Sequence, residues 1–133
     1  MPADFELMPS TRTVYTRGWG SLSDADLLHH MARIAALFTR GALDAEWAQI
    51  CDFSGVVDLD GVTSDGIRRA AEGNPWPRYT VRAFIVSTSE QFGLARMYQA
   101  LGDPKTSDLC ITHSADEADA FIRRERARLG IAI

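Results

Sequence analysis

The sequence predicts an α/β fold, in which residues 1–133 form one domain with a mixed, mostly parallel β-sheet and about four helices. Short apolar runs typical of buried strands alternate with segments whose apolar residues recur at helical spacing. Glycine, proline and capping residues separate these segments at the intervals expected for short connections. With 133 residues, of which 46% are hydrophobic, the chain is large enough to bury a continuous core.

The first elements are two extended segments. Residues Phe5–Met8 and Thr13–Trp19 are separated by Pro9-Ser-Thr-Arg12, which has the composition of a turn. This connection is too short to hold a helical crossover. We therefore expect an antiparallel hairpin at the N-terminus.

A first helix is predicted to begin at Ser23. The Ser23 side chain can cap the free N–H groups of a helix start, and Asp24 and Asp26 favour the positive end of the helix dipole. Apolar residues then recur every three or four positions, which gives one stripe that faces a core. We interpret His29 and His30 as a pair on the surface, away from that stripe.

Three strand–helix units follow. Their strands are expected at Trp47–Phe53, Val81–Val86 and Leu109–Thr112. Their helices are expected to begin at Thr63 or Ser64, within Ser87–Glu90, and at Ser114. The expected order is ββαβαβαβα, and the crossovers make the later strands parallel. The loops after those strands should emerge at one edge of the sheet, where ligand sites in open α/β folds lie.

Charge and composition argue against several classes of function. Charged residues make up 24% of the chain, and a formal net charge of −4 gives no positive field to attract nucleic acid. No apolar stretch reaches the roughly 20 residues of a membrane-spanning helix, and the first residues lack the regions of a signal peptide. We therefore expect a cytoplasmic protein that neither binds nucleic acid nor inserts into a membrane.

The stretch after Phe53 is the most informative for function. It is rich in glycine and acidic residues, and it reads as a loop that leads to a helix start near Ser64. Such a loop suits docking by another protein. The residues expected at this contact are Ser54, Asp58, Asp60, Ser64, Asp65, Gly66 and Ile67. The spacing of the acidic residues does not match a calcium-binding loop, and neither a metal site nor a cofactor is predicted.

Several stretches of the chain resemble the SpoIIAA-like family, often labelled STAS/SEC14-like, of the anti-sigma-factor antagonist superfamily. The stretches are Val14–Asp26, Asp52–Val56, Leu59–Asp60, Ser64–Ile67 and Phe92–Leu101. The resemblance implies a small, non-enzymatic α/β domain without a cofactor. It would act as a regulatory or protein-interaction module whose partner is another protein, such as a regulator or a kinase.

The resemblance also implies a site of phosphorylation. In the signalling members of the family, a partner kinase phosphorylates a serine at the start of the second helix, and this ends binding to that partner. The closest match to the motif here is Thr63-Ser-Asp-Gly66. Asp65 occupies the position of the phosphorylated serine, so Ser64 is the nearest hydroxyl that a kinase could modify.

Other interpretations remain open. A carrier of a small apolar ligand would bind it between the sheet and the third helix, although core packing explains the same residues. The pocket residues would be Phe84, Phe92, Met97 and Tyr98. An enzyme acting through Asp60, Asp65 and a hydroxyl has no recognisable motif. A homodimer is compatible with the sequence, and Trp76, between two prolines, is expected to be exposed.

Overall fold

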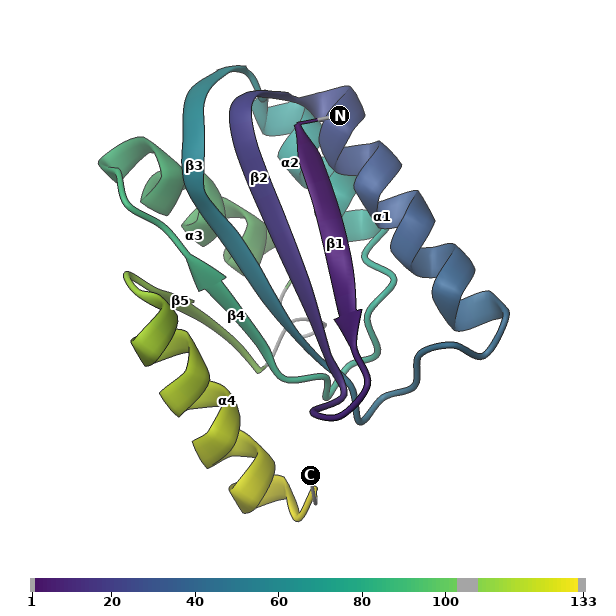
Figure 1. Ribbon diagram of the computed structural model, residues 1–133. Helices are drawn as coiled ribbons and strands as arrows, with labels where there is room; N and C mark the ends of the chain where they lie inside the picture. The colour runs from purple at the N-terminus through teal and green to yellow at the C-terminus, as the bar shows by residue number, and fades with distance from the viewer. Residues whose placement is uncertain (1, 103–107, 132–133) are drawn as a thin grey trace.

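The computed structural model describes residues 2–102 and 108–131, and it confirms the α/β fold and the predicted order of elements (Figure 1). The strands are β1 (Ala3–Met8), β2 (Thr13–Ser23), β3 (Ala48–Gly61), β4 (Arg82–Ile85) and β5 (Leu109–Thr112). The helices are α1 (Asp24–Thr39), α2 (Ser64–Glu72), α3 (Ser89–Gly102) and α4 (Ala115–Leu129).

The five strands form one sheet in the order β1-β2-β3-β4-β5. β1 and β2 pair antiparallel as the predicted hairpin, and the other three pairs are parallel because a helix connects the strands of each pair. Every crossover moves one strand further in the same direction. Right-handed crossovers of this kind place all their helices on one face of the sheet.

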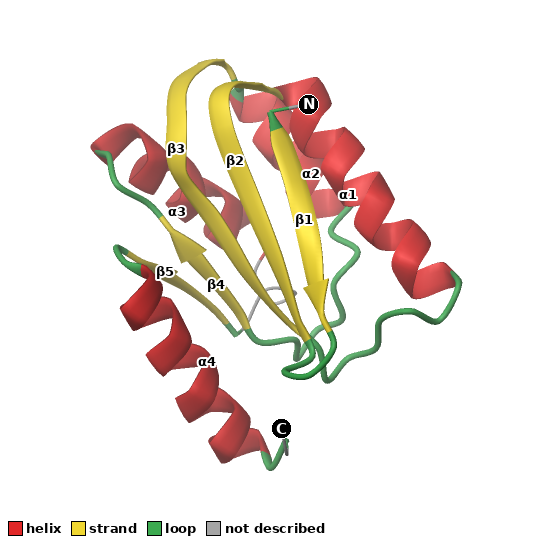
Figure 2. Cartoon of the chain, in the orientation of Figure 1, coloured by secondary structure: helices red, strands yellow, loops and turns green. Residues whose placement is uncertain are grey.

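The two faces of the sheet are therefore covered unequally. α1, α2 and α3 lie together on one face, whereas α4 follows the last strand and packs on the other face against β4 and β5 (Figure 2). In the described part of the chain, no helix covers β1, the upper part of β2 or the second half of β3 on the side where α4 lies. This sheet is thus fully layered on one side and half open on the other.

The acidic stretch after Phe53 is a strand and not the loop that the sequence predicts. β3 continues to Gly61, and its second half pairs with the end of β2, which continues to Ser23. The ladder shifts register after Arg17, and Gly20 has a positive φ of 63°. Glycine and aspartate are typical of loops, but the hydrogen bonds of a ladder come from the main chain, so pairing with β2 overrides the local composition.

Side-chain caps define the starts of the helices. Ser23 caps α1 in a capping box: its Oγ accepts the Asp26 N–H at 3.3 Å, and the Asp26 carboxylate accepts the Ser23 N–H at 2.9 Å. Thr63 caps α2, because its Oγ1 accepts the Gly66 N–H at 3.0 Å. Ser114 caps α4 in the same way. Caps predicted from local sequence are thus largely confirmed.

A hydrogen-bonded contact joins the starts of α1 and α2. The Asp24 carboxylate accepts the Thr63 N–H at 2.9 Å and the Thr63 hydroxyl at 2.6 Å. Gly66 lies directly beneath this carboxylate, and a Cβ at position 66 would overlap the Asp24 side chain. Glycine at this position therefore has a packing reason that is independent of any phosphorylation motif.

Apolar side chains fill the space on both sides of the sheet. The cluster between the sheet and α1–α3 includes Cys51, Ile67, Ala70, Phe84, Val86, Ala95 and Tyr98. The cluster under α4 includes Ile50, Val81, Ala83, Ile85, Ala118 and Ile122. Trp76 is 5% exposed and packs edge-on against Phe38 at 5.3 Å, so its predicted exposure is wrong. The connection from α2 to β4 turns this ring inward, where it closes one end of the core.

We predict that Gly66→Ala lowers the free energy of unfolding by about 1–3 kcal/mol, because the added methyl group displaces the Asp24 carboxylate from its bonds to Thr63. Gly93→Ala in α3 is the matched control, since a Cβ there meets nothing within 4 Å. Alanine at position 93 should be neutral or stabilising by up to about 1 kcal/mol. Urea unfolding measures both, and an unchanged stability of Gly66→Ala would contradict the contact.

Candidate functional site

A cavity lies between the sheet and α1, α2 and α3. The volume of this cavity is about 90 Å³. A single water molecule needs roughly 10–15 Å³, and a cavity of about 150 Å³ holds benzene. Most of the wall is apolar, and it includes Phe53, Leu59, Val62, Ile67, Trp76 and Phe84. The cavity is therefore large enough for a small molecule and has the wall chemistry for an apolar one.

A few polar side chains reach this cavity from five different elements. They are Thr16 of β2, His30 of α1, Gln49 of β3, Arg82 of β4, and Tyr98 and Gln91 of α3. Among the described residues, no Asp or Glu lines the cavity. The interior thus combines apolar walls with a small polar group that carries one permanent positive charge, that of the Arg82 guanidinium.

Arg82 is the only one of these buried polar residues that carries a permanent charge. It is 3% exposed, and its Nε donates to Gln49 Oε1 at 3.0 Å. Its Nη1 donates to Tyr98 Oη at 3.0 Å and to Asn74 Oδ1 at 3.5 Å. Nη2 has no hydrogen-bond acceptor in the described part of the chain. No Asp or Glu of that part forms an ion pair with Arg82.

Three aromatic rings surround the guanidinium. Its Cζ lies 5.7 Å from the ring centre of Trp76, 5.4 Å from that of Phe84 and 5.5 Å from that of Tyr98. The faces of aromatic rings attract a cation by about 0.5–2 kcal/mol each. These rings partly compensate the removal of the charge of Arg82 from water, but they neutralise none of it.

A chain of hydrogen bonds leads from Arg82 to His30. An arginine N–H can only donate, so the amide oxygen of Gln49 faces Arg82 and its NH₂ group faces Thr16, whose Oγ1 accepts at 3.0 Å. The Thr16 hydroxyl proton is then available to Nε2 of His30, 3.3 Å away. Because Nε2 accepts this hydrogen bond, the single ring proton of neutral His30 lies on Nδ1. Nδ1 is buried and has no partner in the described residues.

His30 is a neutral, partly buried residue, and unlike His29 it does not lie on the exposed surface that the sequence predicts for the pair. Burial lowers the pKa of His30 to about 4, and the charges of Arg33 and Arg82 add to this effect. The ring of His30 packs edge-on against Phe5 at 5.9 Å, whereas His29 is exposed. Adjacent helical residues point about 100° apart, so only one of the two histidines could join the buried stripe.

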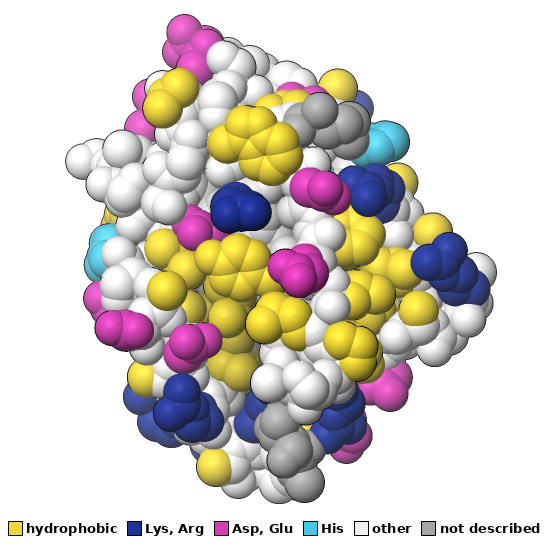
Figure 3. Space-filling model, in the orientation of Figure 1, with side chains coloured by type: hydrophobic (Ala, Val, Ile, Leu, Met, Phe, Trp, Pro, Cys, Tyr) yellow, Lys and Arg dark blue, Asp and Glu magenta, His cyan; other side chains and the backbone are white. Residues whose placement is uncertain are grey.

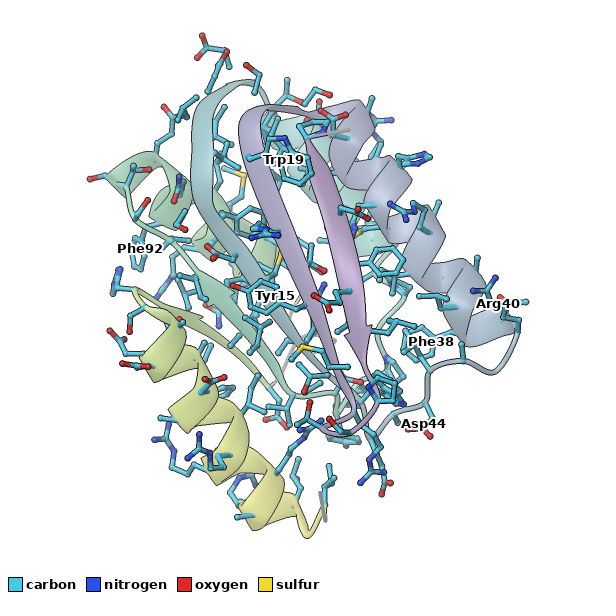
Figure 4. All side chains as sticks on the ribbon, in the orientation of Figure 1. Tyr15, Trp19, Phe38, Arg40, Asp44 and Phe92 are labelled. Carbon is cyan, nitrogen blue, oxygen red and sulfur yellow. The ribbon has the colours of Figure 1, made fainter. Side chains whose placement is uncertain are left out.

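The residues predicted to line a pocket separate into two groups. Phe84 and Tyr98 line the cavity. Met97 packs against the neighbouring core cluster and does not line the cavity. Phe92 is 38% exposed and stacks on His113 with ring centres 6.0 Å apart, and Figure 4 shows it at the outer side of α3. Helical spacing accounts for the difference, because Phe92 and Met97 lie on other faces of α3 than Tyr98.

The residues predicted for docking on the acidic stretch are exposed, and they make contacts within β2 and β3. Asp58 accepts the Ser21 hydroxyl at 3.0 Å and the Asp60 N–H at 2.8 Å. The Ser54 hydroxyl donates to Asp52 at 2.6 Å. Because these side chains project from a strand, they form a row along β3 and not the tip of a loop.

The predicted docking residues at the start of α2 differ in their exposure. Asp65 is paired with Arg68 and Arg69, and the hydrogen bond from Arg68 lowers the pKa of the Asp65 carboxyl. Gly66 and Ile67 are buried, and Ile67 lines the cavity. Ser64 is exposed at the first residue of the helix. Phosphorylation of Ser64 stays a prediction.

The polar centre of the cavity was not predicted, although the sequence of the two central strands indicates it. Arg82 stands between Val81 and Ala83 in an apolar strand, and Gln49 stands between Ala48 and Ile50. Polar side chains inside a strand that is buried on both faces must find partners, and Arg82 and Gln49 are directly paired in the register of β3 and β4. A polar residue that interrupts each of two central strands therefore indicates a buried contact.

In residues 2–102 and 108–131, no three His, Cys, Asp or Glu side chains lie close enough together to hold a metal ion. Within the same residues, none of the helices has both the length and the apolar character needed to cross a bilayer. Comparisons with models of protein families, with curated proteins and with solved structures gave no match. The resemblance to the SpoIIAA-like family therefore stays a prediction, and the cavity is interpreted from its own chemistry.

We predict that the free energy of unfolding falls as the pH decreases from 6.5 to about 4, and that His30 causes a defined part of this loss. The pKa of His30 is about 4 in the folded protein and near its ordinary value of 6.5 after unfolding. The unfolded state then binds more protons in this window, so stability rises with pH. The contribution of His30 is on the order of 3 kcal/mol.

Urea unfolding at several pH values between 4 and 6.5 measures this effect. His30→Gln should have a flatter pH dependence than the wild type, whereas His29→Gln, which changes the exposed neighbour, should keep the wild-type slope. An unchanged slope in His30→Gln would show that this histidine is not held neutral by burial.

Proposed function

We propose that this protein binds a small apolar molecule in the cavity between the sheet and α1–α3 and acts as its carrier. The observation that carries the proposal is an apolar cavity lined by Arg82 and His30, each of which has a donor without a partner, Nη2 of Arg82 and the buried Nδ1 of His30. Packed interiors rarely keep either voids or unpaired polar atoms. A bound molecule would fill the void and provide acceptors for the donors.

The walls of the cavity offer a route for a ligand. Leu27 of α1, Val62 before α2 and Leu94 of α3 line the cavity and are partly exposed. Met31 also lines it and is partly exposed, and the flexible methionine side chain adapts to different shapes. Small rearrangements of side chains, without unfolding of any element, are therefore sufficient for exchange with solvent.

The chemistry of the cavity favours binding over catalysis. Cys51 is its only thiol among the described lining residues, and burial raises the pKa of this thiol to about 12. A thiol at that pKa remains protonated at neutral pH and is a poor nucleophile. The neutral His30 is bonded to Thr16 and has no Ser or Cys partner to activate. These observations support a carrier more than an enzyme.

We predict that Ala95→Leu abolishes binding of a small apolar probe and raises the melting temperature by a few degrees, because the larger side chain fills the cavity that Ala95 lines. Ala100→Leu is the matched control, since residue 100 is exposed on the same helix. Calorimetric titration with propan-1-ol measures binding. Organic extraction of each protein from its native host, followed by mass spectrometry, identifies the natural ligand.

The proposal fails if wild-type protein neither yields an extracted molecule nor binds propan-1-ol at millimolar concentration. It also fails if Ala95→Leu, folded by its circular dichroism spectrum, binds the probe as wild type does. Ala100→Leu should behave as wild type in both measurements, which separates the filling of the cavity from a general effect of leucine in α3.

A second function, docking by another protein, is favoured by exposed apolar side chains at the ends of β2 and β3. Trp19 is 44% exposed and Val57 is 86% exposed. Trp19 lies on the part of the sheet that no described helix covers (Figure 4), and hydrophobic side chains gather on this face in Figure 3. Exposed apolar groups next to the carboxylates of Asp58 and Asp60 are typical of interaction surfaces. The partner proposed is a regulator or a kinase.

We predict that a partner captured from the native host by the wild-type protein is lost with the double variant Trp19→Ser/Val57→Ser, because the exposed apolar contact is removed. Ala95→Leu, which changes the cavity and not this surface, should retain the partner. The intact mass of the captured protein reports phosphorylation of Ser64. If the double variant captures the partner as well as the wild type does, or if the wild type captures no partner, docking at this surface is contradicted.

A further inference from the structure

The charge inside the cavity is positive and lacks a counterion. The guanidinium of Arg82 forms no ion pair with any described residue, whereas Arg68 and Arg128 pair with carboxylates at the surface. No described Asp or Glu lines the cavity. An unpaired charge in an apolar interior is unfavourable, and an opposite charge brought by a ligand relieves it.

The free donors of this group match a carboxylate. Nη2 of Arg82 offers two N–H groups without an acceptor, and the bond from Nη1 to Asn74 is long, at 3.5 Å. A carboxylate can therefore accept from both Nη atoms and displace only that weak bond. Nδ1 of His30 is a further buried donor without a partner, linked to Arg82 through Thr16 and Gln49.

The remainder of the cavity offers nothing polar to a ligand. Phe53, Leu59, Val62 and Leu94 are apolar. The Gln91 amide is already bonded, since its Oε1 accepts the Ser87 N–H at 2.7 Å and its Nε2 donates to the Val56 carbonyl at 2.9 Å. The site thus has one cationic end and one apolar end, which is the complement of an amphipathic monoanion.

We infer that the ligand of the cavity is a short aliphatic monocarboxylate, whose carboxylate pairs with Arg82 and whose hydrocarbon chain fills the apolar end. This inference rests on the proposed function, because it specifies the molecule that the carrier takes. A cavity of about 90 Å³ is smaller than the roughly 150 Å³ that holds benzene, which limits the ligand to fewer than the six non-hydrogen atoms of benzene, as in propanoate. Dianions bring a second charge for which the site has no second cation.

Two probes that differ only in the head group test this inference. Propanoate and propan-1-ol have the same hydrocarbon chain, but only propanoate carries a charge at pH 7. Calorimetric titration of the full chain should show that propanoate binds at least tenfold more tightly than propan-1-ol. In Arg82→Met, which places a neutral side chain of similar length there, the ratio of propanoate affinity to propan-1-ol affinity should fall at least tenfold.

A control variant and a measurement on the wild-type protein complete the test. Arg96→Met changes an exposed arginine of α3, and it should leave propanoate affinity as in the wild type, which excludes a general effect of charge. If the circular dichroism spectrum shows that Arg82→Met is unfolded, the ratio of the two affinities in the wild-type protein still decides the question.

The results distinguish the identity of the ligand from the carrier function itself. If the wild-type protein binds propan-1-ol as tightly as propanoate, or if folded Arg82→Met keeps the wild-type ratio of the two affinities, the carboxylate assignment is overturned and binding of a small apolar molecule stands. If neither probe binds at millimolar concentration, both the assignment and the carrier function are overturned.

Discussion

The buried guanidinium of Arg82 is the interaction around which the interior is arranged. It binds Gln49 on the neighbouring strand and Tyr98 on α3, and it lies against the rings of Trp76 and Phe84. Apolar side chains alone could collapse to close a void, because their contacts have no direction. A buried charge needs acceptors at set distances and angles, and these hold strands and helices at positions that leave the cavity open.

The handedness of the crossovers decides where this cavity and the exposed surface lie. Strands added in sequence order bring α1, α2 and α3 to one face, and the cavity forms beneath them. Successive residues of a strand point to opposite faces, so Gly18 lines the cavity while Trp19 faces the side without a helix. The cavity and the proposed docking surface thus share the same strand.

The predictions were correct where contacts between residues close in sequence decide the structure. They were wrong where contacts between distant segments decide it. Ser23 and Ser114 cap helices as predicted, because a cap involves residues three positions apart. The strand after Phe53 extends through an acidic, glycine-rich stretch because β2 provides its hydrogen-bonding partner. His30 and Trp76 turn inward for a similar reason, since the space that receives each ring is made by segments distant in sequence.

The sequence by itself determined the class of fold and the order of its elements, because hydrophobic periodicity, capping and turn composition are properties of short segments. Only the tertiary structure decided the site. Thr16, His30, Gln49, Arg82 and Tyr98 come from five elements, and nothing in their spacing along the chain shows that they meet. They meet because parallel pairing sets Gln49 beside Arg82 and because the helices pack over that pair, and both depend on the whole sheet.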